Sequence, residues 1–199
     1  IEVFHNFTLL HDDVMDRADT RRGKPTVHKK WNDNTAILSG DAMLIKAYQF
    51  MQQVPVDKLP ALLDLFSKTA IEVCEGQQYD VDFENDLAVT LPQYIEMIRL
   101  KTAVLLAAAL KMGAIIGGAS LQDANALYDY GINLGLAFQL RDDYLDSFGD
   151  PAVFGKKIGG DICCNKKTFL MITALQTASE EQRKELLQWI GCTDATCHD

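Results

Sequence analysis

The sequence has 199 residues, of which 48% are hydrophobic and 24% are charged, and its formal net charge is −9 at pH 7. This composition is typical of a soluble globular protein with one sizeable core, and it argues against intrinsic disorder. The acidic excess argues against nucleic acid or an anionic membrane surface as the main partner, because both require clustered Lys and Arg.

Cysteine usage and hydropathy indicate the compartment. Five cysteines without a Cys-x-x-Cys pair indicate neither a disulfide framework nor a zinc site, and they fit a reducing, cytoplasmic setting. Lys111 and Gly113 interrupt the longest apolar stretch, so we expect no stable membrane insertion. Because the chain begins at Ile1 inside an amphipathic pattern, we expect it to lack N-terminal helices and, at the other end, a finishing helix.

The predicted elements are helices throughout. Apolar residues from Val3 to Met15 follow helical spacing and predict a first helix, which a basic loop at Thr20–Asn32 follows. Further helices are expected at residues 34–53, 57–84, 92–99, 101–117, 122–148, 166–178 and 179–190, with a Gly- and Lys-rich loop at 149–165. No stretch alternates as a strand does. The sequence therefore predicts one all-α domain over residues 1–199, folded as a helical bundle.

Two clusters of aspartates stand near the C-terminal ends of predicted helices. In the first cluster, Asp12 and Asp16 share a helix face and Asp13 is offset; the second repeats the pattern with Asp142, Asp143 and Asp146. Carboxylates one turn apart repel each other unless a cation lies between them. Mg²⁺ prefers a few carboxylates and completes its shell with water and phosphate oxygens, so the clusters predict Mg²⁺ and a phosphorylated substrate.

Basic residues follow both clusters. Arg21 and Arg22 come directly after the first, where they either balance local acid in a solvated loop or clamp a phosphate. Lys156, Lys157 and Lys166 belong to the later loop, whose glycines let the backbone approach a ligand. That loop lacks the Walker A spacing, so it is not a P-loop. The acidic residues from Asp80 to Asp86 are expected to form a solvated turn.

Taken together, the motifs carry more information than any one of them. Lys101-Thr102 begins the apolar helix and Gln139 precedes the second aspartate cluster, and each alone is unremarkable. The chain combines two Asp-Asp-x-x-Asp motifs, Arg-Arg-Gly-Lys-Pro after the first, Lys-Thr between them, Phe-Gln before the second and a Lys-rich Gly-x-Asp loop after it. This combination resembles the trans-isoprenyl diphosphate synthase, or polyprenyl synthetase, family, of the short-chain farnesyl and geranylgeranyl type. The resemblance covers nearly the whole chain.

The resemblance implies a bundle of the isoprenoid synthase type around a central cavity, a homodimer, and head-to-tail condensation of isopentenyl diphosphate with an allylic diphosphate to a C15 to C20 product. It implies Mg²⁺ ligands at Asp12, Asp16 and Asp142, with Asp13, Asp143 and Asp146 in or near the shell. It places the allylic diphosphate at Arg21, Lys101, Lys166 and either Lys156 or Lys157, and isopentenyl diphosphate at His5 and Arg22. Lys101, Thr102 and Gln139 would be catalytic, the last two near the reacting carbon, and Asp161 would orient a lysine.

Phe7 bears on product length. It precedes Asp12 by five residues, so at 1.5 Å per residue it lies roughly 7.5 Å further along the helix, where a growing prenyl tail would run. A bulky ring there would act as a floor and favour a C15 or C20 product. The ordinary alternative is a core aromatic on an amphipathic helix.

Two other functions share parts of this pattern. A class I terpene cyclase also ionises diphosphates with Mg²⁺, but it is expected to have one Asp-rich motif and an Asn/Ser/Glu triad. A non-catalytic regulatory subunit of a prenyl synthase would not need both aspartate motifs. The family's upstream Gly-Lys-x-Arg-x-Arg-Pro motif is absent from these residues, so part of the isopentenyl diphosphate site is expected to be missing.

Overall fold

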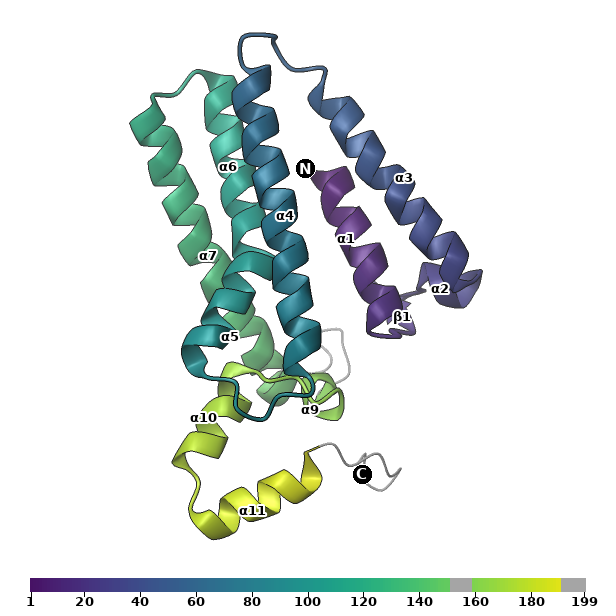
Figure 1. Ribbon diagram of the computed structural model, residues 1–199, viewed down its shortest axis with the longest axis vertical. Coiled ribbons are helices and arrows are strands. Elements are labelled where there is room, and N and C mark those ends of the chain that lie inside the picture. The colour runs from purple at the N-terminus through teal and green to yellow at the C-terminus, as the bar shows by residue number, and fades with distance from the viewer. Residues whose placement is uncertain (151–158, 191–199) are drawn as a thin grey trace. The chain divides into compact units, whose positions relative to one another are not determined.

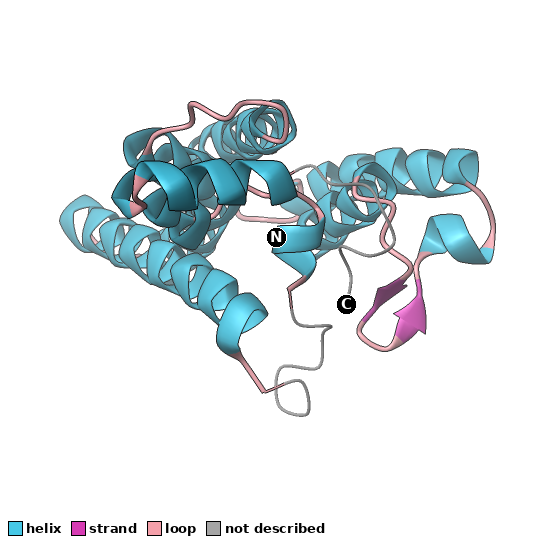
Figure 2. Ribbon diagram, turned by 90° about the horizontal axis from the view of Figure 1, so that it is seen from below, coloured by secondary structure: helices cyan, strands magenta, loops and turns pink. Residues whose placement is uncertain are grey.

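A computed structural model describes residues 1–150 and 159–190. Its regular structure is helical apart from one small hairpin (Figures 1 and 2). In chain order the elements are α1 (Glu2–Met15), β1 (Thr20–Arg21), β2 (Lys24–Pro25), α2 (Val27–Lys30), α3 (Asp33–Met51), α4 (Leu59–Phe83), α5 (Leu91–Ile98), the π-helix η1 (Arg99–Ala103), α6 (Val104–Gly117), α7 (Leu121–Phe148), α9 (Gly160–Cys163), α10 (Phe169–Thr177) and α11 (Glu180–Trp189). The prediction of an all-α fold is confirmed.

Side-chain caps explain where several helices begin. The Asn32 side chain accepts a hydrogen bond from the backbone N–H of Thr35 at 2.8 Å and starts α3. A reciprocal capping box between Thr90 and Gln93, with a proline in the first turn, starts α5. These caps satisfy N–H groups that would otherwise lack partners at a helix start. The helix boundaries therefore fall close to the predicted ones.

Three local features differ from the prediction. The basic loop contains the hairpin β1–β2, in which Thr20 pairs with Pro25, and the short helix α2. The segment between α5 and α6 continues as the π-helix η1. In the Gly- and Lys-rich loop, Gly160–Cys163 form one short helix, α9, after a glycine with φ of 77°. Strands of two residues are too short to show alternation in the sequence.

The chain divides into two compact units, which are described separately. The first comprises residues 1–67 and 111–124, and the second comprises residues 68–110 and the described residues from Asn125 onward. The core of the first unit is aromatic: Phe4 lies 5.2 Å from Phe66 in an edge-on arrangement, and Tyr48 packs on the same Phe66 ring at 4.9 Å. Helices α1 and α3 contact each other in this unit.

In the second unit, a buried cluster joins α4, α5 and α10. Its members are Phe83, Val89, Tyr94, Met97, Ile98 and Ile172. Two glycines of α7 allow close packing on α6 and η1, because a Cβ at Gly131 would lie 2.4 Å from Ala107 Cα and a Cβ at Gly135 would lie 2.4 Å from Ala103 Cα. The second unit therefore has its own core, around the helices that carry most of the predicted site.

One stretch corrects the expectation about transmembrane length. Leu91–Gly117, which spans α5, η1 and α6, is long and apolar enough to cross a membrane, with 39% of its most apolar window buried. Tyr94, Ala103 and Val104 from this stretch are each at most 1% exposed. A core helix of a globular protein has the same length and composition, so this feature is weak evidence for a membrane span.

Candidate functional site

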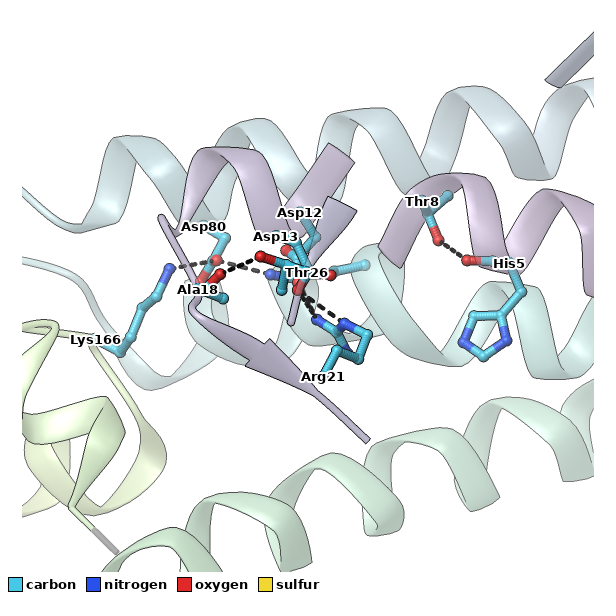
Figure 3. Close-up of polar contacts among 10 residues, drawn as sticks. His5, Thr8, Asp12, Asp13, Ala18, Arg21, Thr26, Asp80 and Lys166 are labelled. Carbon is cyan, nitrogen blue, oxygen red and sulfur yellow. Dashed lines mark hydrogen bonds and ion pairs between the residues drawn. The ribbon is translucent and has the colours of Figure 1, made fainter. Parts of the chain in front are cut away.

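The first aspartate motif lies at the end of α1, as predicted, with Asp16 as the residue that ends the helix. Asp13 is the buried member, at 6% exposure. Its Oδ1 accepts a hydrogen bond from Arg21 Nε at 2.8 Å, and Arg21 Nη2 lies 3.4 Å from Asp12 Oδ2 (Figure 3). Burial raises the pKa of Asp13, and the Arg21 guanidinium opposes that rise without cancelling it. Arg21 therefore balances part of the negative charge that the motif concentrates.

The hairpin positions the two adjacent arginines. Strand β1 ends at Arg21, and the turn after it carries Arg22 at φ 52° and Gly23 at φ 73°. The left-handed conformation is free for glycine but costs another residue about 1 to 2 kcal/mol. The Thr26 hydroxyl donates to the carbonyl of Ala18 at 2.7 Å and closes the base of the loop (Figure 3). The basic loop is thus an ordered structure with a strained Arg22 at its tip.

His5 and Phe7 precede the motif on α1. The His5 ring lies 3.8 Å from the Glu2 carboxylate, and its side chain is 39% exposed. Phe7 is 8% exposed and packs between Phe4, with ring centroids 5.5 Å apart, and His11, at 4.8 Å. Phe7 is therefore a core aromatic of the first unit. Its role as a floor for the prenyl tail stays a prediction, as does the ligand role of His5.

The second aspartate motif lies near the end of α7 and is bound more tightly into the protein. Asp143 is 4% exposed and Asp146 is 6% exposed, whereas Asp142 is half-buried. Asp146 Oδ2 accepts the backbone N–H of Asp161 at 3.0 Å, and the Asp146 carbonyl accepts that of Gly159 at 2.7 Å. Asp146 therefore ties α7 to the start of α9.

Lys101 and Thr102 lie on the π-helix η1, a rare conformation that is frequent at functional sites. Glycines bring two neighbouring helices against it. A Cβ at Gly76 of α4 would lie 2.2 Å from Lys101 N, and a Cβ at Gly135 of α7 would lie 2.4 Å from Ala103 Cα. No side chain fits at either position without moving backbone, so these glycines hold Lys101 and Thr102 close to α4 and α7.

Thr102 and Gln139, both predicted to lie near the reacting carbon, contact each other. Thr102 Oγ1 donates to Gln139 Oε1 at 3.1 Å, and Gln139 Nε2 donates to Asp143 Oδ1 at 3.0 Å. The hydroxyl of Tyr94 donates to Asp143 Oδ2. Burial raises the pKa of Asp143, although hydrogen bonds from Tyr94, Gln139 and the backbone N–H of Phe169 oppose the rise. Four residues from η1, α7 and α5 thus form one continuous chain of hydrogen bonds.

Asp80 brings two of the predicted phosphate-binding lysines together. Its Oδ2 accepts a hydrogen bond from Lys166 Nζ at 2.8 Å (Figure 3). The same Oδ2 accepts from Lys101 Nζ at 2.8 Å, and Lys166 Nζ also lies 2.8 Å from Glu84 Oε1. Burial alone would raise the pKa of Asp80, but the two ammonium groups outweigh it and lower that pKa. Lys101 and Lys166, distant in sequence, are therefore held around one point.

Asp80 and Tyr94 are not among the residues expected at the site. The expectation that Asp80 to Asp86 form a solvated turn is wrong for Asp80, which is 8% exposed. Helical spacing carries the missed signal, because Asp80 is in register with the buried Val73 and Phe83 on one face of α4. Tyr94, at 1% exposure, carries no such signal, since an aromatic on an amphipathic helix is typical of a core.

The lysine-rich loop is described only from residue 159. Lys156 and Lys157 lie outside the described residues, so the choice between them stays open. Asp161 lies in α9, and its backbone carbonyl accepts the N–H of Lys166 at 2.9 Å. That bond places the backbone of Lys166 beside Asp161, while the predicted action of the Asp161 side chain on a lysine stays a prediction.

Comparison with known proteins decides the family. The model of the polyprenyl synthetase family matches residues 1–199, the whole chain. The chain belongs to the polyprenyl synthetase family. Geranylgeranyl diphosphate synthase of Methanosarcina mazei is a relative with 47% identity over 178 residues, which are 88% of this chain and 55% of that protein.

Solved structures of polyprenyl synthetases show the same fold. The crystal structure of a geranylgeranyl pyrophosphate synthase matches with a TM-score of 0.92 and 56% identity, over 99% of this chain and 61% of that one. Polyprenyl synthase from Caulobacter crescentus, crystallised with calcium and isoprenyl diphosphate, matches with a TM-score of 0.89 and 34% identity, over 99% and 60%. The predicted isoprenoid synthase fold is confirmed. The chain spans about 60% of the length of the curated relatives it matches first.

The carboxylates of this polyprenyl synthetase differ in how well they fit a divalent cation. Mg²⁺ and Ca²⁺ take carboxylate and water oxygens, which the two motifs supply. Within residues 1–150 and 159–190, no group of three or more His, Cys, Asp or Glu side chains is gathered to hold a metal ion. Three of the carboxylates are buried, and each accepts a protein hydrogen bond: Asp13, Asp143 and Asp146. The other three are more exposed, and by their exposure they fit a cation best: Asp12, Asp16 and Asp142.

Proposed function

We propose that the protein containing this chain is a short-chain polyprenyl diphosphate synthase, which joins isopentenyl diphosphate head-to-tail to an allylic diphosphate. The observation that carries the proposal is the family match over residues 1–199, which include both aspartate motifs and the lysine pair on Asp80. Relatives with high identity are named as geranylgeranyl diphosphate synthases, which supports a C20 product within the expected C15 to C20 range.

The lysine pair supplies the diphosphate contacts that this reaction needs. Lys101 and Lys166 each lie 2.8 Å from Asp80 Oδ2, so their ammonium groups are oriented before a ligand arrives. A diphosphate has several anionic oxygens and can be bound by both groups at once. With Arg21 as a further donor, these residues would stabilise the negative charge that grows on the diphosphate when its C–O bond breaks.

We propose Mg²⁺ as the cofactor, with Asp12, Asp16 and Asp142 as its protein ligands. When bound, it would act as a Lewis acid on the departing diphosphate. The carboxylates would fix its place, and the Caulobacter relative, crystallised with calcium and isoprenyl diphosphate, supports the pairing of a divalent cation with a diphosphate in this family.

The reacting carbon carries positive charge once the C–O bond breaks, and water would quench it. The oxygens of Thr102 and Gln139 are oriented dipoles that would stabilise this charge without reacting with it. The double bond of isopentenyl diphosphate then attacks the allylic carbon, and the adduct loses a proton to the released diphosphate.

We further propose that the protein is a cytoplasmic homodimer and that Phe7 sets product length. Free thiols at the described Cys74, Cys163 and Cys164 support a reducing compartment. The burial of Phe7 against Phe4 gives its ring a fixed position. Light scattering after gel filtration tests the dimer, and the product of Phe7→Ala tests the floor, because a longer product is expected and an unchanged one would exclude it.

A prenyl-transfer assay tests the main proposal. The complete protein is incubated with isopentenyl diphosphate and with dimethylallyl, geranyl or farnesyl diphosphate, in the presence of Mg²⁺ or of EDTA. We expect Mg²⁺-dependent consumption of both substrates and a prenyl diphosphate product. A hydrocarbon or alcohol formed from the allylic substrate alone would indicate a cyclase instead, and absence of any reaction would refute catalysis by this protein.

A further inference from the structure

A directional chain of hydrogen bonds ends at Thr102. It begins at the hydroxyl of Tyr94, passes through both oxygens of Asp143 and the amide of Gln139, and reaches the hydroxyl of Thr102. The two donor–acceptor distances at the Gln139 amide are 3.0 and 3.1 Å. These hydrogen bonds join three elements, α5, α7 and η1, and all four residues lie within the second unit.

The chemistry of Asp143 fixes the direction of this chain. An ionised carboxylate only accepts hydrogen bonds, and each oxygen of Asp143 accepts from a neutral donor, the Tyr94 hydroxyl or the Gln139 amide. Gln139 must therefore present Nε2 to Asp143, which turns its Oε1 toward Thr102. The Thr102 hydroxyl donates its proton to that Oε1, so the lone pairs of Thr102 Oγ1 point away from Gln139.

Burial decreases along this series of hydrogen bonds, from Tyr94 to Thr102. Tyr94 is 1% exposed and Asp143 is 4% exposed, whereas Gln139 and Thr102 are both half-buried. The buried end is fixed by packing, and the end with access to solvent can meet a ligand. At 4% exposure, with both oxygens already accepting protein hydrogen bonds, Asp143 is poorly placed to ligate a metal as well.

We propose that Tyr94 and Asp143 are positioning residues, which hold the Gln139 amide with its carbonyl oxygen toward Thr102, and that Asp143 serves this purpose rather than metal binding. The inference rests on the proposed prenyl transfer. It separates Asp143 from Asp142, its neighbour in the motif. It also gives Tyr94, which lies eight residues before Thr102 in the sequence, a function beyond the core.

The orientation matters because it sets the sign of the dipoles near the substrate. With Oε1 of Gln139 at Thr102, both residues present oxygen, the negative end of their dipoles, to a developing positive charge. A flipped amide would present N–H groups and oppose that charge. Asp143→Asn causes this flip, because Tyr94 would donate to the new amide oxygen and the new amide N–H groups would donate to Gln139 Oε1.

The test compares Asp143→Asn with Asp142→Asn in the complete protein. For Asp143→Asn we expect kcat to fall about 10- to 100-fold, with the KM of the allylic diphosphate and the Mg²⁺ concentration for half-maximal activity within about twofold of wild type. Asp142→Asn, in contrast, is expected to raise the Mg²⁺ requirement. Tyr94→Phe keeps Asp143 but removes one donor, so its kcat should fall less.

A swap of the two polar groups separates orientation from a merely structural role. In the double variant Gln139→Glu/Asp143→Asn, the new Asn donates to one oxygen of the new Glu, and the other oxygen again faces Thr102. The total charge is unchanged. We expect the double variant to recover kcat by about tenfold relative to Asp143→Asn, since the dipole orientation is restored.

Two results would overturn the inference. If Asp143→Asn raises the Mg²⁺ requirement as Asp142→Asn does, or if the double variant is no better than Asp143→Asn, the inference is overturned. Thermal melting of each variant identifies any loss of folding. If Asp143→Asn does not fold, Tyr94→Phe still decides, because a lower kcat at an unchanged Mg²⁺ requirement supports the inference and an unchanged kcat overturns it. An inactive wild type would instead refute the proposed function itself, and the inference with it.

Discussion

The two aspartate motifs share one sequence pattern but are bound into the protein by different partners. Asp13 and Asp143 occupy the same position of the motif and are 6% and 4% exposed. The partner of Asp13 is a cation, Arg21, whereas Asp143 accepts from the neutral Tyr94 and Gln139. Burial raises the pKa of both carboxyl groups. The middle carboxylate is thus balanced by a cation in the first motif and accepts hydrogen bonds from neutral donors in the second.

The last position of the motif differs as well. Asp16 ends α1 and is exposed, whereas Asp146 is 6% exposed and accepts the backbone N–H of Asp161. Spacing along a helix decides which carboxylates share a face. Tertiary packing decides which of those carboxylates are buried, and the outcome at the last position is different in the two motifs.

At the first position of the two motifs, substitution should have the same effect on catalysis. Asp12 and Asp142 are both half-buried and are both proposed ligands of Mg²⁺. Asp12→Asn and Asp142→Asn are each expected to lower kcat about 100- to 1000-fold, the loss typical of removing one group that stabilises charge in the transition state. Steady-state kinetics of the complete protein across Mg²⁺ concentrations measures this. A large loss in only one of the two would break the symmetry at this position.

Asp80 extends the comparison to a carboxylate between two cations. Its lowered pKa means that its ion pairs stabilise the fold fully above the unfolded-state value of 3.8 and lose that effect as pH falls through the lower folded value. Asp80→Asn should therefore lower the free energy of unfolding by about 2 kcal/mol at neutral pH, the size typical of hydrogen bonds to charged groups. The difference from wild type should shrink as pH falls below about 4. Urea denaturation at several pH values measures it; a difference independent of pH would contradict the ion-pair account.

Asp146 and Asp16 give a matched pair for stability. Asp146→Ala leaves the partly buried N–H of Asp161 without its acceptor, which should cost about 1 to 3 kcal/mol. Asp16→Ala should change stability by less than about 0.5 kcal/mol, since an exposed carboxylate at a helix C-terminus gains little there. Urea denaturation of both variants tests the pair, and equal losses would show that the two positions are bound alike.

Sequence patterns predict the helical part of the fold well because each signal is local. Apolar periodicity marks α1, and a proline with a reciprocal Thr90–Gln93 cap marks α5. The hairpin beside Arg21 escapes prediction because its strands have two residues each. The π-helix η1 escapes it as well. Lys101 of η1 lies against Gly76, and Ala103 lies against Gly135, and nothing within residues 99–103 records those contacts.

The same limit applies to the site. Spacing places Asp12 and Asp16 on one face and pairs Gln139 with Asp143 along α7, because residues four apart in a helix are neighbours. It cannot show that Tyr94, 49 residues before Asp143, completes that pair. Asp80 and Lys166 are 86 residues apart, and their contact likewise exists only in the folded chain.

The smallest expected effect is that of salt on stability, which should differ between the middle positions of the two motifs, Asp13 and Asp143. Arg21 is 34% exposed, so ions reach its pair with Asp13. Between 0.1 and 1 M NaCl the screening length falls from about 10 to about 3 Å. The stability difference between wild type and Asp13→Asn should therefore shrink by a few tenths of a kcal/mol. For Asp143→Asn it should not change, because no cation is lost. Urea denaturation at both salt concentrations compares them, and equal salt dependence would mean that a cation also balances Asp143.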